Sequence, residues 1–156
     1  MKIPNKDMKT RILFLCHGNI CRSPMAEYVM KFLAAQAHRS EEFRITSAAV
    51  SYEEEGNGIY PPAQRKLREE GIPFGTHRAH RITPSEYAQA DLVIVMDQSN
   101  LRLLSRIVGP DTEGKVHKLL EYAGSSRDVA DPWYTGDFNA TYDDILRGCR
   151  GLLAAL

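Results

Sequence analysis

Apolar residues along the chain fall into two patterns, short unbroken runs and longer stretches with helical spacing. Short runs are typical of strands buried on both faces, and they occur at residues 11–15, 43–49, 92–96 and, more weakly, 115–119. Apolar residues at i, i+3 and i+4 predict amphipathic helices, and they occur at residues 24–38, 61–70, 100–108 and from Asn139 onward. Strands that alternate with helices favour an α/β fold with a parallel sheet covered on both faces.

Glycine, proline and polar residues mark the boundaries between these elements. Thr83-Pro-Ser-Glu86 has the capping-box pattern with proline at the first helical position, so a further helix is expected to start there. Gly71 and Gly109-Pro110 are expected to end the helices that precede them. Residues 121–138 are interpreted as one long loop, and loops of this length usually carry a function.

Composition narrows the class of protein. A chain of 156 residues suits one domain, here expected over residues 9–156 with a flexible polar tail over residues 1–8. Lys and Arg number 20 and Asp and Glu number 20, so no net charge draws the chain to nucleic acid, and no apolar run is long enough to predict a membrane partner. The 3 cysteines lack the spacing of a disulfide scaffold and favour a reducing, cytoplasmic location. No Cys/His cluster has metal-ligand spacing, so no metal and no cofactor is expected.

The stretch with the clearest chemistry begins at the first strand, Leu13-Phe-Leu-Cys-His-Gly-Asn-Ile-Cys-Arg-Ser-Pro-Met-Ala-Glu27. It passes from a buried strand through a short loop into a helix, with Ser23 as the predicted N-cap and Pro24 at the first helical position. The loop amides and the helix dipole at such a junction favour a bound anion. The sequence therefore predicts an anion site directly after the first strand.

Two side chains in this loop point to phosphoryl transfer. Cys16 ends the strand, where the field of the helix N-terminus should stabilise a thiolate. Arg22, separated from it by five residues, can present a planar fork of donors to two oxygens of a tetrahedral anion, and Gly18 lets the backbone approach closely. A lone cysteine is more often a buried hydrophobe and a lone arginine a surface residue. In this context they predict attack on phosphorus with a phosphocysteine intermediate.

Residues 15–27 closely resemble the signature of the low-molecular-weight protein tyrosine phosphatases. The resemblance covers nearly the whole chain from Lys9, through Ser47-Ala-Ala49, Gly71-Ile72, His77, Met96-Asp-Gln-Ser-Asn-Leu101 and Asp131-Pro-Trp-Tyr134. It implies a three-layer fold with a four-stranded parallel sheet. It also implies metal-free hydrolysis of phosphotyrosine in proteins, and we expect a monomer.

The resemblance also implies roles for the loop and its surroundings. Cys16 is the nucleophile and Arg22 the phosphate clamp, while the phosphate lies against the loop made of His17, Gly18, Asn19, Ile20, Cys21 and Arg22. Asn19, Ser47 and His77 match positions that support the loop by hydrogen bonds. Ser23, if it turns inward instead of capping the helix, would hydrogen-bond the Cys16 sulfur and stabilise it as a leaving group.

A proton donor for the departing tyrosine is expected at Asp131-Pro132. An Asp-Pro pair alone most often starts a turn, but the family's general acid lies in an Asp-Pro-aromatic sequence near the C-terminus. Trp133 and Tyr134 are interpreted as a wall that stacks on the phenyl ring, with packing against the last helix as the alternative for one of them.

One rim departs from the family pattern. Where many members carry an aromatic residue, this chain has Glu53, within Tyr52-Glu-Glu-Glu55, so Tyr52 is taken as the wall residue or the wall is missing. The acidic run is either a solvated loop or, if it borders the cleft, a feature that repels acidic peptides. Related protein-arginine phosphatases tend to carry Thr at the position of Ile20. Ile20 therefore favours a substrate with a flat phenyl ring, such as phosphotyrosine.

Three other functions remain open at this point: arsenate reduction, protein-arginine phosphatase activity and phosphate binding without turnover. Arsenate reductases share this loop but need further cysteines, and none lies between Cys21 and Cys149. A phosphate-binding module without turnover would not need Cys16, Arg22 and Asp131 together. Cys16 and Cys21 lie close enough in the loop for a reversible disulfide to be hypothesised. Asp97 is expected to cap a helix or support the site, and Cys149 to lie in the core.

Overall fold

Strand β1 (Thr10–Cys16) has a parallel neighbour on each side in the computed structural model of this chain, which describes residues 8–156. β2 (Phe43–Ala49) lies along one side and β3 (Leu92–Val95) along the other, with β4 (Val116–Lys118) beyond β3. All three pairings are parallel, so the predicted four-stranded parallel sheet is confirmed. The tail expected over residues 1–8 lies outside the described residues except for Met8.

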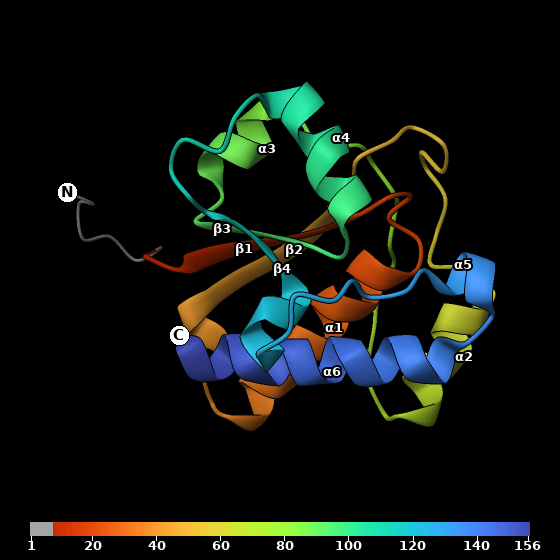
Figure 1. Cartoon of the computed structure of the whole chain (residues 1–156). Coiled ribbons are helices and arrows are strands. Elements are labelled where there is room, and N and C mark those ends of the chain that lie inside the picture. Colours follow the sequence, from red (N-terminus) through yellow and green to blue (C-terminus); the bar gives the residue numbers. More distant parts are fainter. Residues whose placement is uncertain (1–7) are drawn as a thin grey trace.

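Helices cover both faces of this sheet, which confirms the three-layer architecture (Figure 1). α1 (Arg22–Gln36) and α6 (Phe138–Ala155) lie on one face, and α3 (Pro84–Gln89) and α4 (Gln98–Val108) on the other. Successive residues of β1 point to opposite faces. Ile12 and Phe14 therefore join the core under α1 and α6, whereas Leu13 and Leu15 join the core under α4. This double burial explains the unbroken apolar run in the sequence.

The remaining elements are short. They are α2 (Pro61–Glu69), α5 (Pro132–Thr135) and the 3₁₀ turns η1 (Ser40–Glu42) and η2 (Leu119–Ala123). The capping box predicted at Thr83 is confirmed, because Thr83 Oγ1 accepts from the Glu86 amide and Glu86 Oε1 accepts from the Thr83 amide. The single long loop expected over 121–138 is wrong, since η2, α5 and the start of α6 occupy parts of it.

The order β2-β1-β3-β4 places a topological switch point at β1. The connection after β1 leads to one side of this strand, and the connection after β2 leads to the other. Ligands of open parallel sheets bind in the crevice that such a switch opens at the carboxyl ends of the strands. Cys16 is the last residue of β1 and therefore lies at this crevice.

α6 is fixed against η2 by a close approach at two glycines. A Cβ at Gly148 would lie 2.4 Å from Leu119 Cγ, and one at Gly151 would lie 1.9 Å from the Tyr122 carbonyl oxygen. Larger side chains could not occupy these positions without moving η2 away. α6 is therefore seated firmly beside the segment that runs from η2 to α5.

Candidate active site

The loop between β1 and α1 curls around the Cys16 sulfur. Asn19 has φ of 61°, a left-handed conformation that asparagine tolerates, and this turns its amide to donate to Cys16 Sγ at 3.3 Å. Among residues 8–156, no acceptor takes the backbone N–H groups of Gly18, Ile20 or Cys21. The predicted anion site therefore has unused donors beside the sulfur.

A chain of buried hydrogen bonds supports the loop from below. Asn19 Nδ2 donates to Ser23 Oγ at 2.8 Å and to Ser47 Oγ at 3.0 Å, and Ser47 Oγ donates to Glu27 Oε1 at 2.6 Å. Ser23 Oγ lies 3.0 Å from Cys16 Sγ. Because Ser23 accepts from Asn19, its own hydroxyl hydrogen can donate to a thiolate at Cys16, which is nearer than its other acceptor, the Ala48 carbonyl oxygen at 3.4 Å. The network thus connects Glu27 to the sulfur.

The expectation that Ser23 caps the helix is wrong. α1 already begins at Arg22, and its N-cap residue Cys21 makes no side-chain cap hydrogen bond. Ser23 is fully buried, and its hydroxyl is held at the sulfur by Asn19. The inward alternative is therefore the one that the structure adopts.

The segment after α2 holds both the backbone and the side chain of Asn19. His77 Nε2 donates to the Asn19 carbonyl oxygen at 2.6 Å, and the His80 amide donates to Asn19 Oδ1 at 3.3 Å. The sequence reasoning found His77 but missed His80 and Glu27. Glu27 had a signal, because it is a charged residue one turn after Ser23 on the apolar face of α1, where only a hydrogen-bonded carboxylate is tolerated.

Arg22 connects the loop to the opposite wall. Its side chain is 2% exposed, and Nη1 donates to Asp97 Oδ2 at 2.7 Å and to the Val129 carbonyl oxygen at 2.9 Å. Burial by itself lowers the pKa of Arg22, but the negative charges of Cys16, Asp131 and Asp97 outweigh it and raise the pKa. Its Nε–H has no acceptor among the described residues. The guanidinium is therefore always charged and keeps a donor for a ligand.

Asp97 fills both roles expected of it. While Oδ2 holds Arg22, Oδ1 accepts from the Asn100 amide at 2.8 Å and caps α4. Asp97, which lies just after β3, thus links the Arg22 side chain to the sheet.

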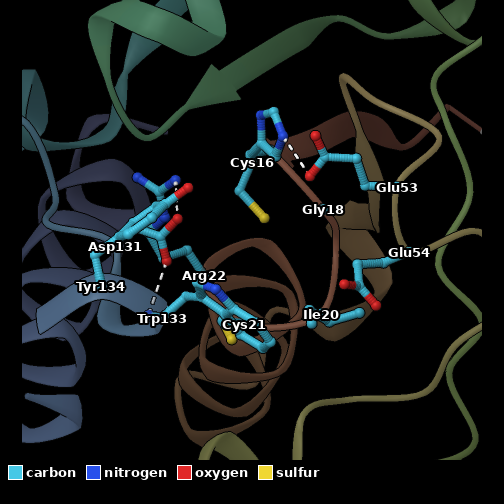
Figure 2. Close-up of a pocket in the computed structure, with 11 residues that line it drawn as sticks. Cys16, Gly18, Ile20, Cys21, Arg22, Glu53, Glu54, Asp131, Trp133 and Tyr134 are labelled. Atoms are coloured by element: carbon cyan, nitrogen blue, oxygen red, sulfur yellow. Dashed lines mark hydrogen bonds and ion pairs between the residues drawn. The ribbon is translucent and has the colours of Figure 1, made fainter. Parts of the chain in front are cut away.

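Asp131 faces the loop from the other wall (Figure 2). It has extended backbone geometry before Pro132, and it is the N-cap of α5 because Oδ1 accepts from the Trp133 amide at 3.1 Å. Its Oδ2 lies 3.4 Å from Arg22 Nη2. The residue therefore both starts a turn and presents a carboxyl to the pocket.

These groups line an open pocket, whose empty space of about 460 Å³ includes the solvent at its mouth. The lining residues are Cys16, His17, Gly18, Ile20, Cys21, Arg22, Glu53, Glu54, Asp131, Trp133 and Tyr134. The Trp133 ring packs against the Tyr60 ring, with 4.9 Å between the ring centroids. Tyr60 in turn stacks on Phe138 at the start of α6. Trp133 is 53% exposed and Tyr134 is 83% exposed, so both aromatic rings stand at the mouth.

Tyr52 lies outside this pocket, contrary to its expected place in the wall. Its hydroxyl accepts from Arg81 Nη1 at 2.9 Å, and the Arg81 guanidinium lies over its ring at 4.6 Å from the centroid. Because Arg81 satisfies both the ring and the hydroxyl, Tyr52 turns away. Glu53 and Glu54 line the mouth in its place, and Glu53 Oε2 lies 2.9 Å from His17 Nε2.

The three cysteines are all free and buried. Burial, together with the charge of neighbouring Cys16, raises the pKa of Cys21, so its thiol is neutral at neutral pH. Cys149 is fully buried in the core, as predicted. The disulfide between Cys16 and Cys21 stays a hypothesis.

Residues 8–156 contain neither a metal-ion site nor a membrane-spanning helix. No group of three or more His, Cys, Asp or Glu side chains is arranged to hold a metal ion. No helix in this part of the chain is long and apolar enough to cross a membrane.

Known proteins match this chain over nearly its full length. The family model for low molecular weight phosphotyrosine protein phosphatase matches residues 11–156. The low molecular weight protein-tyrosine-phosphatase YfkJ of Bacillus subtilis is 36% identical over 147 residues, 93% of this chain and 94% of that protein. Its crystal structure has a TM-score of 0.90 and covers 94% of each chain.

Two further proteins widen the comparison. The human low molecular weight phosphotyrosine protein phosphatase is 37% identical over 147 residues, 91% of this chain and 92% of that protein. The crystal structure of a Drosophila arginine phosphatase is 29% identical with a TM-score of 0.83, and the match covers 92% of this chain and 96% of that chain.

Proposed function

Because this chain belongs to the low molecular weight phosphotyrosine protein phosphatase family and is a protein-tyrosine phosphatase, we propose that Cys16, Arg22 and Asp131 carry its reaction. One observation supports this most directly: the Cys16 sulfur lies 3.3 Å from the Asn19 amide and 3.0 Å from the Ser23 hydroxyl, in a pocket that Arg22 and Asp131 also line. A sulfur anion and a phosphate clamp that share one pocket suit phosphoryl transfer.

In the first step, the Cys16 thiolate attacks phosphorus and forms the S–P bond. The bond from phosphorus to the tyrosine oxygen breaks, and Asp131 gives its proton to that oxygen. The Arg22 guanidinium and the unused amides of Gly18, Ile20 and Cys21 hold the equatorial oxygens.

In the second step, the Asp131 carboxylate accepts a proton from water, and the water oxygen attacks phosphorus. The S–P bond breaks, and phosphate leaves with the water oxygen. The Cys16 thiolate is restored as the leaving group. Ser23 stabilises it, since its hydroxyl is held 3.0 Å from the sulfur and already accepts from Asn19.

Phosphotyrosine-containing proteins are the proposed substrates. The exposed Trp133 and Tyr134 rings flank the pocket, and Ile20 gives its wall an apolar surface that suits a phenyl ring. Activity in the cytoplasm and as a monomer belongs to the same proposal. The three free cysteines fit a reducing compartment.

A single assay series tests the reaction. We expect the protein to release phosphate from an aryl phosphate in EDTA, and to carry a covalent phosphoryl group on Cys16 when it is denatured during turnover. Cys16→Ser should abolish both signals, whereas Cys149→Ser, a matched change in the core, should leave phosphate release intact. Release that survives Cys16→Ser would overturn the mechanism.

Phosphoarginine is the second candidate substrate, because the Drosophila arginine phosphatase shares the fold at 29% identity. We expect higher kcat/KM for a phosphotyrosine peptide than for the same peptide with phosphoarginine. Ile20→Thr should narrow that ratio by removing the apolar wall. A preference for phosphoarginine in the unaltered protein would reverse the substrate assignment. Both alternatives without phosphatase turnover, arsenate reduction and simple phosphate binding, fail if phosphate is released.

A further inference from the structure

The segment that carries Asp131 has no regular structure of its own. Residues 125–130 belong to no helix, strand or turn between η2 and α5. In Figure 1 this segment runs along α6 before it enters α5. Its position must therefore come from contacts with neighbouring elements. One is a backbone bond, from the Val129 amide to the Met96 carbonyl oxygen at 2.9 Å.

Arg127 ties the segment to α6 by a two-pronged contact. Nη1 donates to Asp144 Oδ2 and Nη2 donates to Asp144 Oδ1, each at 2.8 Å. Such paired parallel bonds fix both distance and orientation. The Asp144 side chain is 11% exposed, and it sits on the helix that the glycine contacts hold against η2. Arg127 is therefore attached to a rigid part of the protein.

Thr141 holds the same segment nearer to the acid. Its hydroxyl donates to the Ala130 carbonyl oxygen at 3.0 Å, and Thr141 is 1% exposed. Thr141 and Asp144 are three residues apart on α6, so they share one face of the helix. Ala130 directly precedes Asp131. One face of α6 thus makes hydrogen bonds to the segment at residue 127 and again at residue 130.

The Asp131 carboxyl itself is held loosely. It accepts a hydrogen bond from the Trp133 amide at 3.1 Å and a long one from Arg22 Nη2 at 3.4 Å. Proton transfer to a leaving oxygen needs hydrogen-bond reach, and a shift of about 1 Å can cost about a hundredfold in rate. The placement of this carboxyl therefore depends on the backbone before it.

We propose that Arg127 and Thr141 are positioning residues, through which α6 sets the place of the Asp131 carboxyl over the leaving-group oxygen. This inference rests on the proposed role of Asp131 as the acid. It assigns to α6, which contributes no residue to the pocket lining, a share in protonating the leaving group. Neither residue touches the substrate.

The test compares two substrates that differ in their need for the acid. Phenyl phosphate releases a basic phenolate that must be protonated, whereas 2,4-dinitrophenyl phosphate releases a stable anion. For Arg127→Ala and Thr141→Val we expect kcat/KM to fall about tenfold with phenyl phosphate and less than about twofold with 2,4-dinitrophenyl phosphate. Phosphate inhibition should stay unchanged, because the loop around Cys16 is untouched.

Arg147→Ala is the matched control. Arg147 also approaches Asp144, but only at 4.0 Å and from within α6. Its loss should therefore leave kcat/KM unchanged for both substrates. If Arg127→Ala unfolds because Asp144 is left unpaired, Thr141→Val still tests the proposal, since valine keeps the shape of the threonine side chain. Equal losses with both substrates, or no loss in Thr141→Val, would overturn the proposal.

Asp131→Asn separates this proposal from its premise. If Asp131→Asn shows the large difference between substrates and the two positioning variants do not, only the role of α6 is wrong. If Asp131→Asn itself slows both substrates equally, Asp131 is not the acid and the proposed mechanism fails with it.

Discussion

The floor of the pocket and its rim are built on opposite principles. On the floor, Cys16, Asn19, Ser23 and Ser47 are at most 5% exposed, and each side chain has a partner within the network. At the rim, Glu53, Trp133 and Tyr134 are exposed, and the Glu53 carboxylate pairs with the partly exposed His17 side chain at 2.9 Å. A floor of this kind fixes one geometry for the reacting atoms, whereas the rim can change without disturbing it. Changes on the floor should therefore be far more costly than changes at the rim.

The largest effect is expected from Arg22→Lys. A lysine keeps the charge but loses the fork that holds Asp97, the Val129 carbonyl and a ligand oxygen together. We expect kcat/KM for an aryl phosphate to fall by about a thousandfold, the range for loss of a donor to a developing oxyanion. Steady-state kinetics on a variant with unchanged circular dichroism would measure this. If kcat/KM fell by less than about tenfold, the positive charge at position 22 would be enough for catalysis, and the fork geometry of arginine would not be needed.

Ser23→Ala should be the next in size. It removes the hydroxyl that stabilises the departing thiolate, so the second step should slow by about a hundredfold and the phosphoenzyme should accumulate. Rapid-mixing kinetics should then show a burst of phenol before a slow steady state. Ser51→Ala is the control. The Ser51 hydroxyl donates to the His17 carbonyl oxygen at 2.9 Å and accepts from the Glu53 amide at 3.4 Å, and neither partner is the sulfur, so this variant should give no burst. Equal losses in kcat and kcat/KM for Ser23→Ala would contradict its role as a leaving-group stabiliser.

Much of the floor was predictable from the sequence, because it depends on local order. A buried strand, a short loop and a helix start follow one another within residues 13–27, and their backbone amides converge whatever the rest of the chain does. Ser23 was the exception. Its helical position resembles an N-cap in sequence, but the competing contact with Asn19 and the sulfur lies across the loop and decides its orientation.

The rim was predicted less well, because it depends on distant partners. Tyr52 turns outward on account of Arg81, which lies 29 residues away in the chain. The hydrogen bonds from α6 to residues 127 and 130 likewise join two segments that only the folded structure brings close together. No local pattern marks either contact, whereas the alternation of strands with helices and the cysteine at the end of β1 followed from local signals.

Asn19 offers a smaller test of the floor. Both Asn19→Gly and Asn19→Ala lose the hydrogen bonds to Ser23 and Ser47, but only alanine must pay for the left-handed backbone at φ of 61°. We expect Asn19→Ala to be less stable than Asn19→Gly by about 1 kcal/mol in urea unfolding. Equal free energies of unfolding would show that the loop relaxes out of this conformation, and the floor would be less rigid than its contacts indicate.

The smallest effect, and the one that separates rim from floor, concerns Glu53 and Glu54. Both carboxylates line the mouth, so a phosphotyrosine peptide with neighbouring Lys or Arg should be preferred over one with Asp or Glu. Exposed charges contribute little each, so Glu53→Gln with Glu54→Gln should reduce that preference by about three- to fivefold in kcat/KM at low salt, and added salt should reduce it in the unaltered protein.

Glu55→Gln is the control for this pair. Its carboxylate accepts from the Arg81 amide at 3.1 Å and does not line the pocket, so the peptide preference should persist. Small aryl phosphates, which carry no charge besides the phosphate and do not extend past the mouth, should react equally well with the unaltered protein and with all three variants. If those small substrates also slow down, the acidic rim acts on the floor through His17 and Glu53, and the two regions are not independent. If they do not, the rim selects the peptide while the floor alone determines the chemistry.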